Sequence, residues 1–331
     1  MNDFRSESYD TEERLVQSAS IATAKEGDRE RLIQEYKRRS ELSFAPSTRR
    51  SRATMLKIFR RYCEEEGFSP EPPCSPFLIA KMIDDFAPKY KTGTIETMLS
   101  AIHELHRANF SVSPRSHPIV QLAFRSAKRN YGTISRQAPP LCRAEILECI
   151  SKLGNSRIEV RDRAVLLVAA DSWCRSAELA ELRMHHMEIQ SDGSAILSIT
   201  RSKTDRFAKG GYAYLSVEAV EAVSDWQRLS QLRPADPMFT RSHSTGSRKA
   251  LLSVTFTQII RRVTGRRDVS SHSTRVGGVH DAMRIGCDMV SIMISGRWQS
   301  AEMPARYGSR FLVGQSAAAR VAASHRNCEE N

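Results

Sequence analysis

The C-terminal half of the chain carries a set of side chains that could together act on a phosphate group. In chain order these residues are Arg175, Lys203, His272, Arg275, Trp298 and Tyr307. Arginine offers a planar fork of donors to phosphate oxygens, and a tyrosine hydroxyl can act as a nucleophile. The phosphate-cradling motif G-x-x-x-x-G-K-[ST] does not occur in the sequence. The set therefore suits phosphoryl transfer in which the protein supplies the nucleophile and the charge stabilisation.

Two arginines of this set have informative neighbours. Arg175 lies in an otherwise apolar stretch, where a guanidinium is costly unless a carboxylate or a phosphate meets it. Glu178, one helical turn later, is a candidate partner. Arg275 and His272 are three residues apart, which places them on one face of a helix.

Tyr307 follows Pro304 by three residues. Proline removes a helix donor and is tolerated in a first turn, so the helix that carries Tyr307 is expected to begin at about Pro304. Lys203 follows an expected strand and should lie near the tip of a hairpin. The tyrosines that compete as nucleophile are Tyr131 near an expected linker, and Tyr212 and Tyr214 on an expected strand.

Each of these residues also has a purely structural interpretation. Arg175 and Glu178 can form a structural ion pair, Trp298 can belong to a core, and a His-x-x-Arg pair can lie on a solvated helix face. A metal site is not expected. The adjacent histidines His185 and His186 would point to opposite faces of a strand, and neither they nor His272 and His280 have clustered carboxylates nearby. No cofactor is expected.

The overall composition indicates a basic protein of two domains. The 331 residues include 50 Lys and Arg against 38 Asp and Glu, a formal net charge of +12, which favours a polyanionic partner such as DNA.

The seven cysteines include no Cys-x-x-Cys pair, so a reducing compartment is expected. The N-terminus lacks the apolar core of a signal peptide, and no apolar run is long enough for a membrane span. We therefore expect a soluble, cytoplasmic, DNA-associated protein.

The N-terminal half is predicted to be all helical. Residues 1–40 are polar and are expected to form an extension. Residues 41–132 should form a helical domain, and residues 133–142, with two prolines, a linker. The periodicity of apolar residues predicts helices over 47–62, with Ser47 as the capping residue, and over 75–86, 92–109 and 117–131.

The C-terminal half, residues 143–331, is predicted to be helical with a small antiparallel sheet. Two short strands are expected, at 194–200 and 211–217. Helices are expected over 143–153, 160–171, 217–232, 255–264, 272–285 and 316–324. The predicted fold class is mainly α, with an all-α N-terminal domain followed by a catalytic domain that contains the small sheet.

Five strings in this order resemble the tyrosine recombinase (phage integrase) family. They are CRSAELAEL, RSKT, HSTRVG, and SGRW followed by ARYG. The Trp in the fourth string is similar to the Cre-like branch, because many relatives carry His there. The likeness covers residues 143 to about 310 and extends less specifically into the helical half, where LHRANFSVSP is similar to the core-binding domain of that branch.

The resemblance implies a role for each residue of the set. Tyr307 would attack a DNA phosphodiester to give a 3′-phosphotyrosyl link, with no metal or small-molecule cofactor. Arg175 and Arg275 would stabilise the charge on the phosphate oxygens. Lys203 would protonate the leaving 5′-oxygen. His272 would assist proton transfer, Trp298 would donate its indole N–H to the phosphate, and Glu178 would hold Arg175 or His272.

Contacts to double-stranded DNA are expected from basic residues in both halves. In the helical domain the candidates are Arg49, Arg50, Arg52, Lys57, Arg60, Arg61, Arg125, Lys128 and Arg129. In the catalytic half they are Arg241, Arg248, Lys249, Arg261, Arg262, Arg266 and Arg267. Some of these side chains are expected to lie on solvated faces without a functional role.

The sequence thus predicts a site-specific DNA recombinase. By the resemblance it would act as a homotetramer on two inverted-repeat target sites, through a Holliday junction. The C-terminal helix over 316–324 would dock on the next protomer or on its own domain. Two alternatives remain open: a sequence-specific DNA-binding regulator with the same fold, and a type IB-like topoisomerase or telomere resolvase.

Overall fold

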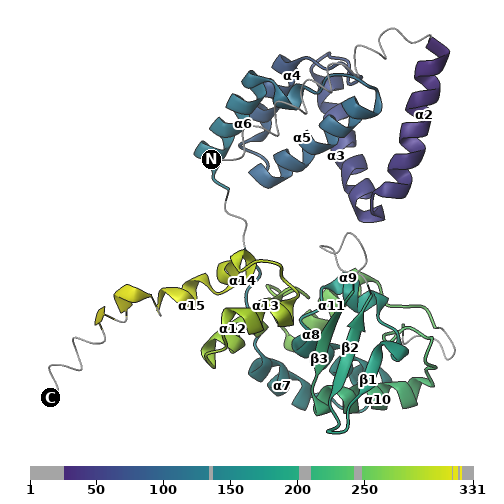
Figure 1. Ribbon diagram of the computed structural model, residues 1–331, viewed down its shortest axis with the longest axis vertical. Coiled ribbons are helices and arrows are strands. Elements are labelled where there is room, and N and C mark those ends of the chain that lie inside the picture. Colours follow the sequence, from purple (N-terminus) through teal and green to yellow (C-terminus); the bar gives the residue numbers. More distant parts are fainter. Residues whose placement is uncertain are drawn as a thin grey trace. The chain divides into compact units, whose positions relative to one another are not determined.

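The computed structural model describes residues 26–133, 137–200, 210–241, 248–314, 316–319 and 321–322. The chain forms two compact units, Met1–Ser135 and Arg136–Asn331 (Figure 1). The described part is mostly helical, with one small sheet, so the predicted fold class is confirmed. No helix within the described ranges is long and apolar enough to cross a membrane.

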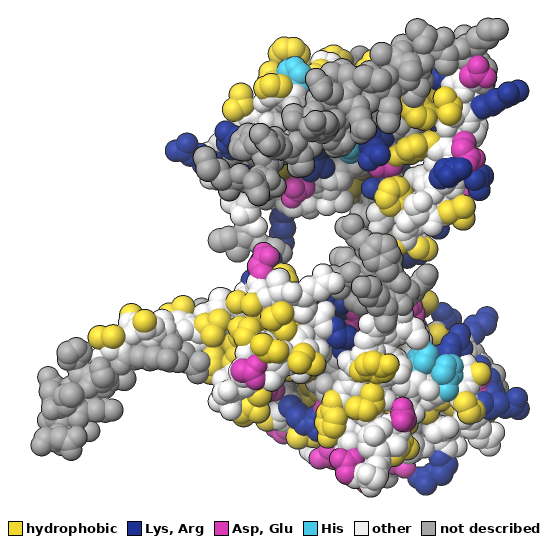
Figure 2. Space-filling model, in the orientation of Figure 1, with side chains coloured by type: hydrophobic (Ala, Val, Ile, Leu, Met, Phe, Trp, Pro, Cys, Tyr) yellow, Lys and Arg dark blue, Asp and Glu magenta, His cyan; other side chains and the backbone are white. Residues whose placement is uncertain are grey.

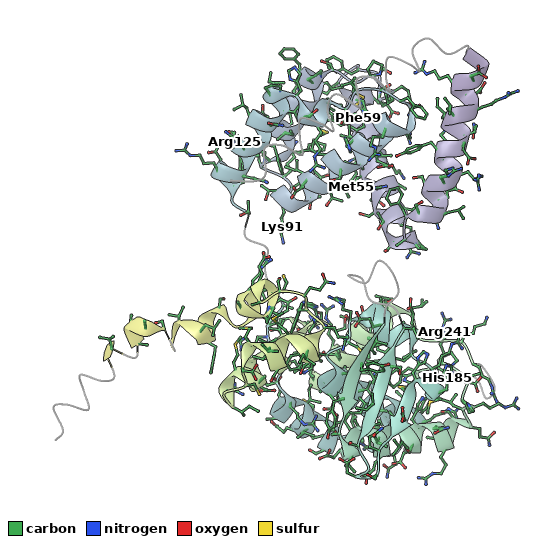
Figure 3. The ribbon with its side chains drawn as sticks, in the orientation of Figure 1. Met55, Phe59, Lys91, Arg125, His185 and Arg241 are labelled. Atoms are coloured by element: carbon green, nitrogen blue, oxygen red, sulfur yellow. The ribbon has the colours of Figure 1, made fainter. Side chains whose placement is uncertain are left out.

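The regular secondary structure of the first unit consists of helices in its described residues. Its helices are α2 (Glu26–Ser43), α3 (Pro46–Glu65), α4 (Pro76–Phe86), α5 (Thr92–Ala108) and α6 (Pro118–Tyr131), with a 3₁₀ turn, η1 (Pro114–Ser116). The apolar faces of α3, α4, α5 and α6 meet in one core that includes Phe59 of α3, Ile83 of α4 and Met98 of α5. Met55 lies one turn before Phe59 and packs against the same core (Figure 3).

Two details of this unit differ from the sequence-based expectation. Helix α3 begins at Pro46, with Ala45 as N-cap and no side-chain cap, so Ser47 is not the capping residue. The proline explains this, because its fixed φ suits the first helical position and it has no N–H that needs a cap. Helix α2 spans the expected boundary at residue 40, and the Tyr36 hydroxyl donates to Glu104 of α5 at 2.5 Å.

The second unit begins with helices α7 (Arg143–Ser151), α8 (Arg157–Ser172) and α9 (Ser176–Glu181). A 3₁₀ turn, η2 (Met184–His186), leads into strands β1 (Met187–Ile189), β2 (Ala195–Ile199) and β3 (Gly211–Leu215). The strands form one antiparallel sheet in the order β1-β2-β3. The sequence did not predict β1, and His185 and His186 lie in η2 instead of on a strand.

The rest of this unit is helical. Its helices are α10 (Val217–Ser230), α11 (Ser253–Thr264), α12 (Ser273–Arg284), α13 (Met289–Gly296), α14 (Glu302–Tyr307) and α15 (Ser309–Val313). Of the expected C-terminal helix, residues 317–319 and 321–322 are helical, and residues 320, 323 and 324 lie outside the described part.

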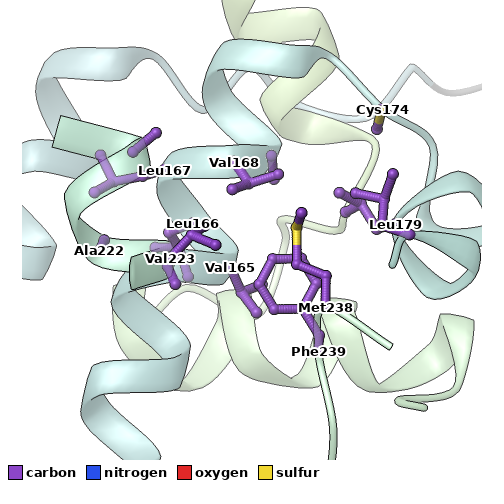
Figure 4. Packing of buried hydrophobic residues seen from close by; sticks show 14 of the residues in the cluster. Val165, Leu166, Leu167, Val168, Cys174, Leu179, Ala222, Val223, Met238 and Phe239 are labelled. Carbon is purple, nitrogen blue, oxygen red and sulfur yellow. The ribbon is translucent and has the colours of Figure 1, made fainter. Parts of the chain in front are cut away.

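Helix α8 is the centre of the second unit. Its residues 164–169 are all buried, because neighbours cover the helix on several sides. Val165 and Val168 belong to one buried cluster with Val223 of α10 and with Phe239, and Figure 4 shows Val165 beside the Phe239 ring. Strand β3 and helices α7, α11 and α12 also contact α8. The residues that follow the C-terminal end of α8 are therefore held against a rigid core.

Candidate active site

Arg175, which is half-buried, and Glu178, which is buried, form an ion pair at the start of α9. The Arg175 Nη1 atom donates to Glu178 Oε1 at 2.7 Å, and the Arg175 backbone N–H donates to Oε2 at 2.9 Å. The Glu178 side chain is 3% exposed and that of Arg175 is 21% exposed. A glutamate three residues into a helix commonly accepts from the preceding backbone N–H, so one side chain caps the helix and fixes the arginine.

A second guanidinium, that of Arg297, reaches the same carboxylate. Its Nη2 atom donates to Glu178 Oε2 at 3.0 Å, and its Nη1 atom donates to the Ser172 carbonyl at 3.0 Å. Burial by itself would raise the pKa of Glu178. The Arg175 backbone N–H and the two guanidinium groups outweigh burial and hold that pKa below its ordinary value. Glu178 is therefore ionised at neutral pH.

Arg275, on α12, is fully buried. Its Nη1 atom donates to the Trp173 carbonyl at 2.7 Å, and its Nη2 atom donates to the Gly296 carbonyl. The guanidinium also lies over the Trp298 ring, 4.2 Å from the ring centroid. Burial, together with the charges of Arg175 and Arg297, lowers the pKa of Arg275 to about 10. The group stays protonated at neutral pH.

His272 and Tyr307 contact each other close to Arg175 and Arg275. The His272 Nε2 and Tyr307 Oη atoms are 2.8 Å apart, and the two ring planes are inclined at 77°. Burial, Arg275 and Arg175 lower the pKa of His272, so its ring is neutral at neutral pH. Burial raises the pKa of Tyr307, while the charges of Arg275 and Arg175 oppose that rise. The neutral ring can accept the tyrosine proton.

The Trp298 ring packs against Tyr307 and Trp173 as well as against the Arg275 guanidinium. Its ring centroid lies 5.8 Å from that of Tyr307 and 6.1 Å from that of Trp173. All three aromatic residues belong to one apolar cluster that also includes Val276 and Val279 of α12. Trp298 therefore joins the helix that carries Tyr307 to Arg275.

Helix α14 carries Tyr307 at its last position and begins at Glu302, two residues before the expected start. Pro304 lies in its first turn, where a missing N–H breaks no helical bond. The Tyr307 carbonyl accepts from the Gln137 side chain at 3.1 Å and contacts the His280 ring at 2.9 Å. These two contacts fix the end of the helix.

Glycines allow α12 to approach its neighbours closely. A Cβ atom on Gly277 would lie 1.9 Å from the Leu141 carbonyl oxygen, and one on Gly278 would lie 2.2 Å from the Trp173 indole nitrogen. The Leu141 N–H also donates to the Ser273 carbonyl at 2.9 Å. The backbone of α12, which carries Arg275 and follows His272, thus lies directly against that of Leu141.

The structure brings most of the sequence-predicted set together in the second unit. The residues that it places in one cluster are Arg175, Glu178, His272, Arg275, Trp298 and Tyr307. Lys203 lies outside the described residues. The competing tyrosines Tyr212 and Tyr214 are exposed on β3. Sequence reasoning missed Arg297, although it follows an apolar helix and thus carries the same signal that singled out Arg175.

The proposed DNA-contacting residues divide into two groups. The first group makes ion pairs within the chain: Arg52 with Glu104, Arg61 with Glu65, Arg248 with Asp236, Arg262 with Asp162, and Arg266 with Glu145. The others make no ion pair with the described residues. They include Arg125 and Arg241, which each lie at the periphery of their own unit (Figure 3). Figure 2 shows that Lys and Arg side chains gather at one edge of the second unit.

Comparisons with known proteins place this site in context. No family model matches the sequence. The chain is 26% identical over 239 residues to the Cre recombinase of Escherichia phage P1, which covers 65% of this chain and 69% of that protein. The chain is thus a homologue of the tyrosine site-specific recombinases, which are DNA strand-transfer enzymes, and the resemblance is confirmed.

Solved structures share the fold. The XerH site-specific recombinase bound to a palindromic difH substrate matches with a TM-score of 0.59 at 16% identity, over 81% of this chain and 78% of that chain. The Tn1549 transposon integrase with right-end DNA matches with a TM-score of 0.58 at 11% identity, over 83% and 94%. A lambda integrase dimer bound to a core site matches with a TM-score of 0.56 at 15% identity, over 83% and 92%.

Replacing Gly277 by alanine should destabilise the second unit. The new methyl would meet backbone atoms of Leu141, which cannot swing away, so the helix must shift at a loss of roughly 1–3 kcal/mol or more in unfolding free energy. Gly93→Ala is the control, because nothing lies within 4 Å of that position. When urea unfolding is followed by circular dichroism, the urea concentration at the unfolding midpoint should be lower than that of wild type for Gly277→Ala only. Equal midpoints for the two variants would contradict the close approach.

Proposed function

We propose that this chain is a site-specific DNA recombinase that cleaves and rejoins DNA through a covalent bond to Tyr307. The observation that carries the proposal is the 2.8 Å contact between Tyr307 Oη and His272 Nε2, within the field of Arg175 and Arg275. Homology to Cre recombinase supports the same chemistry. A nucleophile, a base and fixed positive charge are the groups that a phosphoryl transfer needs.

The charge balance of the site favours an anionic substrate. Three guanidinium groups, those of Arg175, Arg275 and Arg297, gather around the Glu178 carboxylate. Positive charge in a buried site is costly unless an anion offsets it. A scissile phosphate would provide that anion, and charge would grow on its oxygens in the transition state. Each donor that meets such an oxygen typically contributes ~10²–10³ in rate.

In the proposed cleavage step, Tyr307 Oη bonds to phosphorus and the bond from phosphorus to the 5′-oxygen breaks. The tyrosine proton passes to His272 Nε2. The leaving 5′-oxygen takes a proton from Lys203, a role that rests on the family resemblance. Trp298 would donate its indole N–H to the phosphate. The freed 5′-hydroxyl of the partner strand then attacks the phosphotyrosine and restores Tyr307, so the phosphate ester bond energy is conserved.

The assembly and the DNA interface are proposed on the same basis. The homologue is a recombinase, and XerH, the Tn1549 integrase and lambda integrase were solved with DNA. We propose that four copies of this chain act on two inverted-repeat sites and pass through a Holliday junction. The proposed DNA-contacting residues that make no ion pair with the described part of the chain would contact DNA phosphates.

Tyr307→Phe should abolish covalent attachment to DNA, because phenylalanine has no nucleophilic oxygen. The test is to express the protein in cells, lyse them in denaturant, recover the protein and sequence any DNA that stays attached. Tyr212→Phe is the matched control, since Tyr212 is an exposed tyrosine on β3. Wild type and Tyr212→Phe should retain DNA from one inverted-repeat site.

Two outcomes would contradict this assignment. An adduct that persists in Tyr307→Phe would exclude Tyr307 as the nucleophile. No adduct from wild type, combined with tight binding to one sequence, would favour the DNA-binding regulator.

The cleavage rate should depend on the protonation of His272. Only the neutral ring can accept the tyrosine proton, and the pKa of His272 lies below its ordinary value of 6.5. The single-turnover rate should therefore be flat above pH 6.5 and fall as the pH decreases through that lowered pKa. His272→Ala should cleave about 10²-fold more slowly and lose this acid limb. The control is His185→Ala, at an exposed histidine, which should keep the wild-type rate and the wild-type acid limb. An acid limb that is unchanged in His272→Ala would exclude His272 as the group that accepts the tyrosine proton.

DNA affinity should fall with salt, and the slope should distinguish the two groups of basic residues. Arg125→Gln should reduce the slope of log K against log salt by about 1 on a fluorescent duplex of arbitrary sequence. Arg266→Gln should leave the slope unchanged, because Glu145 and Asp268 already pair with Arg266. A wild-type affinity that does not change with salt would argue against DNA as the partner.

A further inference from the structure

Arg297 is a buried cation to which the cleavage step assigns no direct role. Its side chain is 10% exposed, and its guanidinium contacts Glu178 Oε2 and the Ser172 carbonyl, each at 3.0 Å. The Nη2 atom also lies 3.6 Å from the Cys174 sulfur. Its terminal nitrogens are thus occupied by groups of the protein, and Nε finds no acceptor among the described residues. This side chain is held in place and faces Glu178.

The backbone at Arg297 is unusual for an arginine. It adopts φ 53° and ψ 43°, the left-handed conformation that glycine takes without steric penalty, at the C-terminal end of α13. Gln231, at the end of α10, has the same φ and ψ. Gly296, which directly precedes Arg297, is packed so closely that a Cβ there would lie 1.9 Å from the Trp298 ring. The side-chain contacts of Arg297 must therefore offset an unfavourable backbone.

The aliphatic part of Arg297 reaches a third element of the site. A Cβ atom on Gly211, the first residue of β3, would lie 2.9 Å from Arg297 Cδ. The same side chain thus touches the start of β3 and, through Glu178, the start of α9. Arg297 itself follows α13 and precedes Trp298, so it connects three segments that border the cluster.

We propose that Arg297 is a positioning residue for DNA strand transfer, which holds the Glu178 carboxylate so that Glu178 fixes the guanidinium of Arg175 toward the scissile phosphate. This inference rests on the proposed function. Glu178 Oε1 accepts from Arg175 Nη1, and Oε2 accepts from both the Arg175 N–H and Arg297 Nη2. Without Arg297 the carboxylate loses one of three donors and can rotate, and Arg175 loses its fixed direction. Arg297 acts through Glu178 because its own terminal nitrogens are already bonded.

The test compares covalent adduct formation by variants in a single turnover. The probe is a duplex that carries the site recovered by covalent capture with wild type, nicked so that the adduct accumulates. Arg297→Gly suits the backbone and removes the side chain. It should bind the duplex as wild type does and form adduct between about 10-fold and 100-fold more slowly, a smaller loss than that of a direct donor. Arg297→Lys keeps the charge and should recover part of the rate.

Two further variants separate positioning from folding. Gln231→Gly makes the same backbone change at the same φ and ψ, away from the site, and should react at the wild-type rate. Glu178→Gln removes the charge through which Arg297 is proposed to act. Adding Arg297→Gly to Glu178→Gln should therefore slow the reaction little further. All variants are compared at a temperature at which circular dichroism shows each to be folded.

Three results would overturn the inference while leaving the proposed function intact. They are a wild-type rate for Arg297→Gly, a penalty in the Glu178→Gln background equal to that in wild type, and a slow Arg297→Gly that Arg297→Lys does not improve. A wild-type protein that forms no adduct with any captured DNA would overturn the proposed function, and this inference with it.

Discussion

The buried guanidinium of Arg275 organises the second unit around one point. It comes from the first turn of α12, donates to the carbonyl that follows α8 and to the last carbonyl of α13, and lies over the Trp298 ring. A planar cation with several donors can bind groups from different segments at once, which no apolar side chain can do. Through this one group Trp298 is held against the site, and the Trp298 ring packs in turn against Tyr307.

The same cation sets the chemistry of its neighbours. Burial, together with its charge and that of Arg175, lowers the pKa of His272 and keeps the ring neutral. Burial raises the pKa of Tyr307, and the same two charges oppose that rise. A neutral imidazole and a hydroxyl beside it are thus held together in a positive field. Preorganised charge of this kind is effective because no reorganisation is needed during the reaction.

Local chemistry explains which features could be predicted from the sequence. The start of helix α4 was predicted to within one residue, at Ser75 where the structure has Pro76, because proline suits the first turn of a helix. In the structure Ser75 is the N-cap, and its hydroxyl accepts from the Phe77 N–H. Strand β1 has three half-buried or exposed residues and no alternating pattern, so its pairing with β2 had no local signal. Arg297 follows an apolar helix and so had a sequence signal, but its contact with Glu178, 119 residues away in the chain, had none. The residue types of the site were predictable, and the contacts between distant segments were not.

The central claim is that Tyr307 Oη becomes bonded to DNA phosphate, and peptide mapping of the covalent complex tests it most directly. Nuclease digestion followed by trypsin should release the peptide Tyr307–Arg310 with a nucleotide attached, and fragmentation in the mass spectrometer would locate the modified residue. We predict the phosphate on Tyr307, joined to the 3′ side of the nucleotide. A nucleotide on Ser309, or on any other residue with Tyr307 unmodified, would contradict the account.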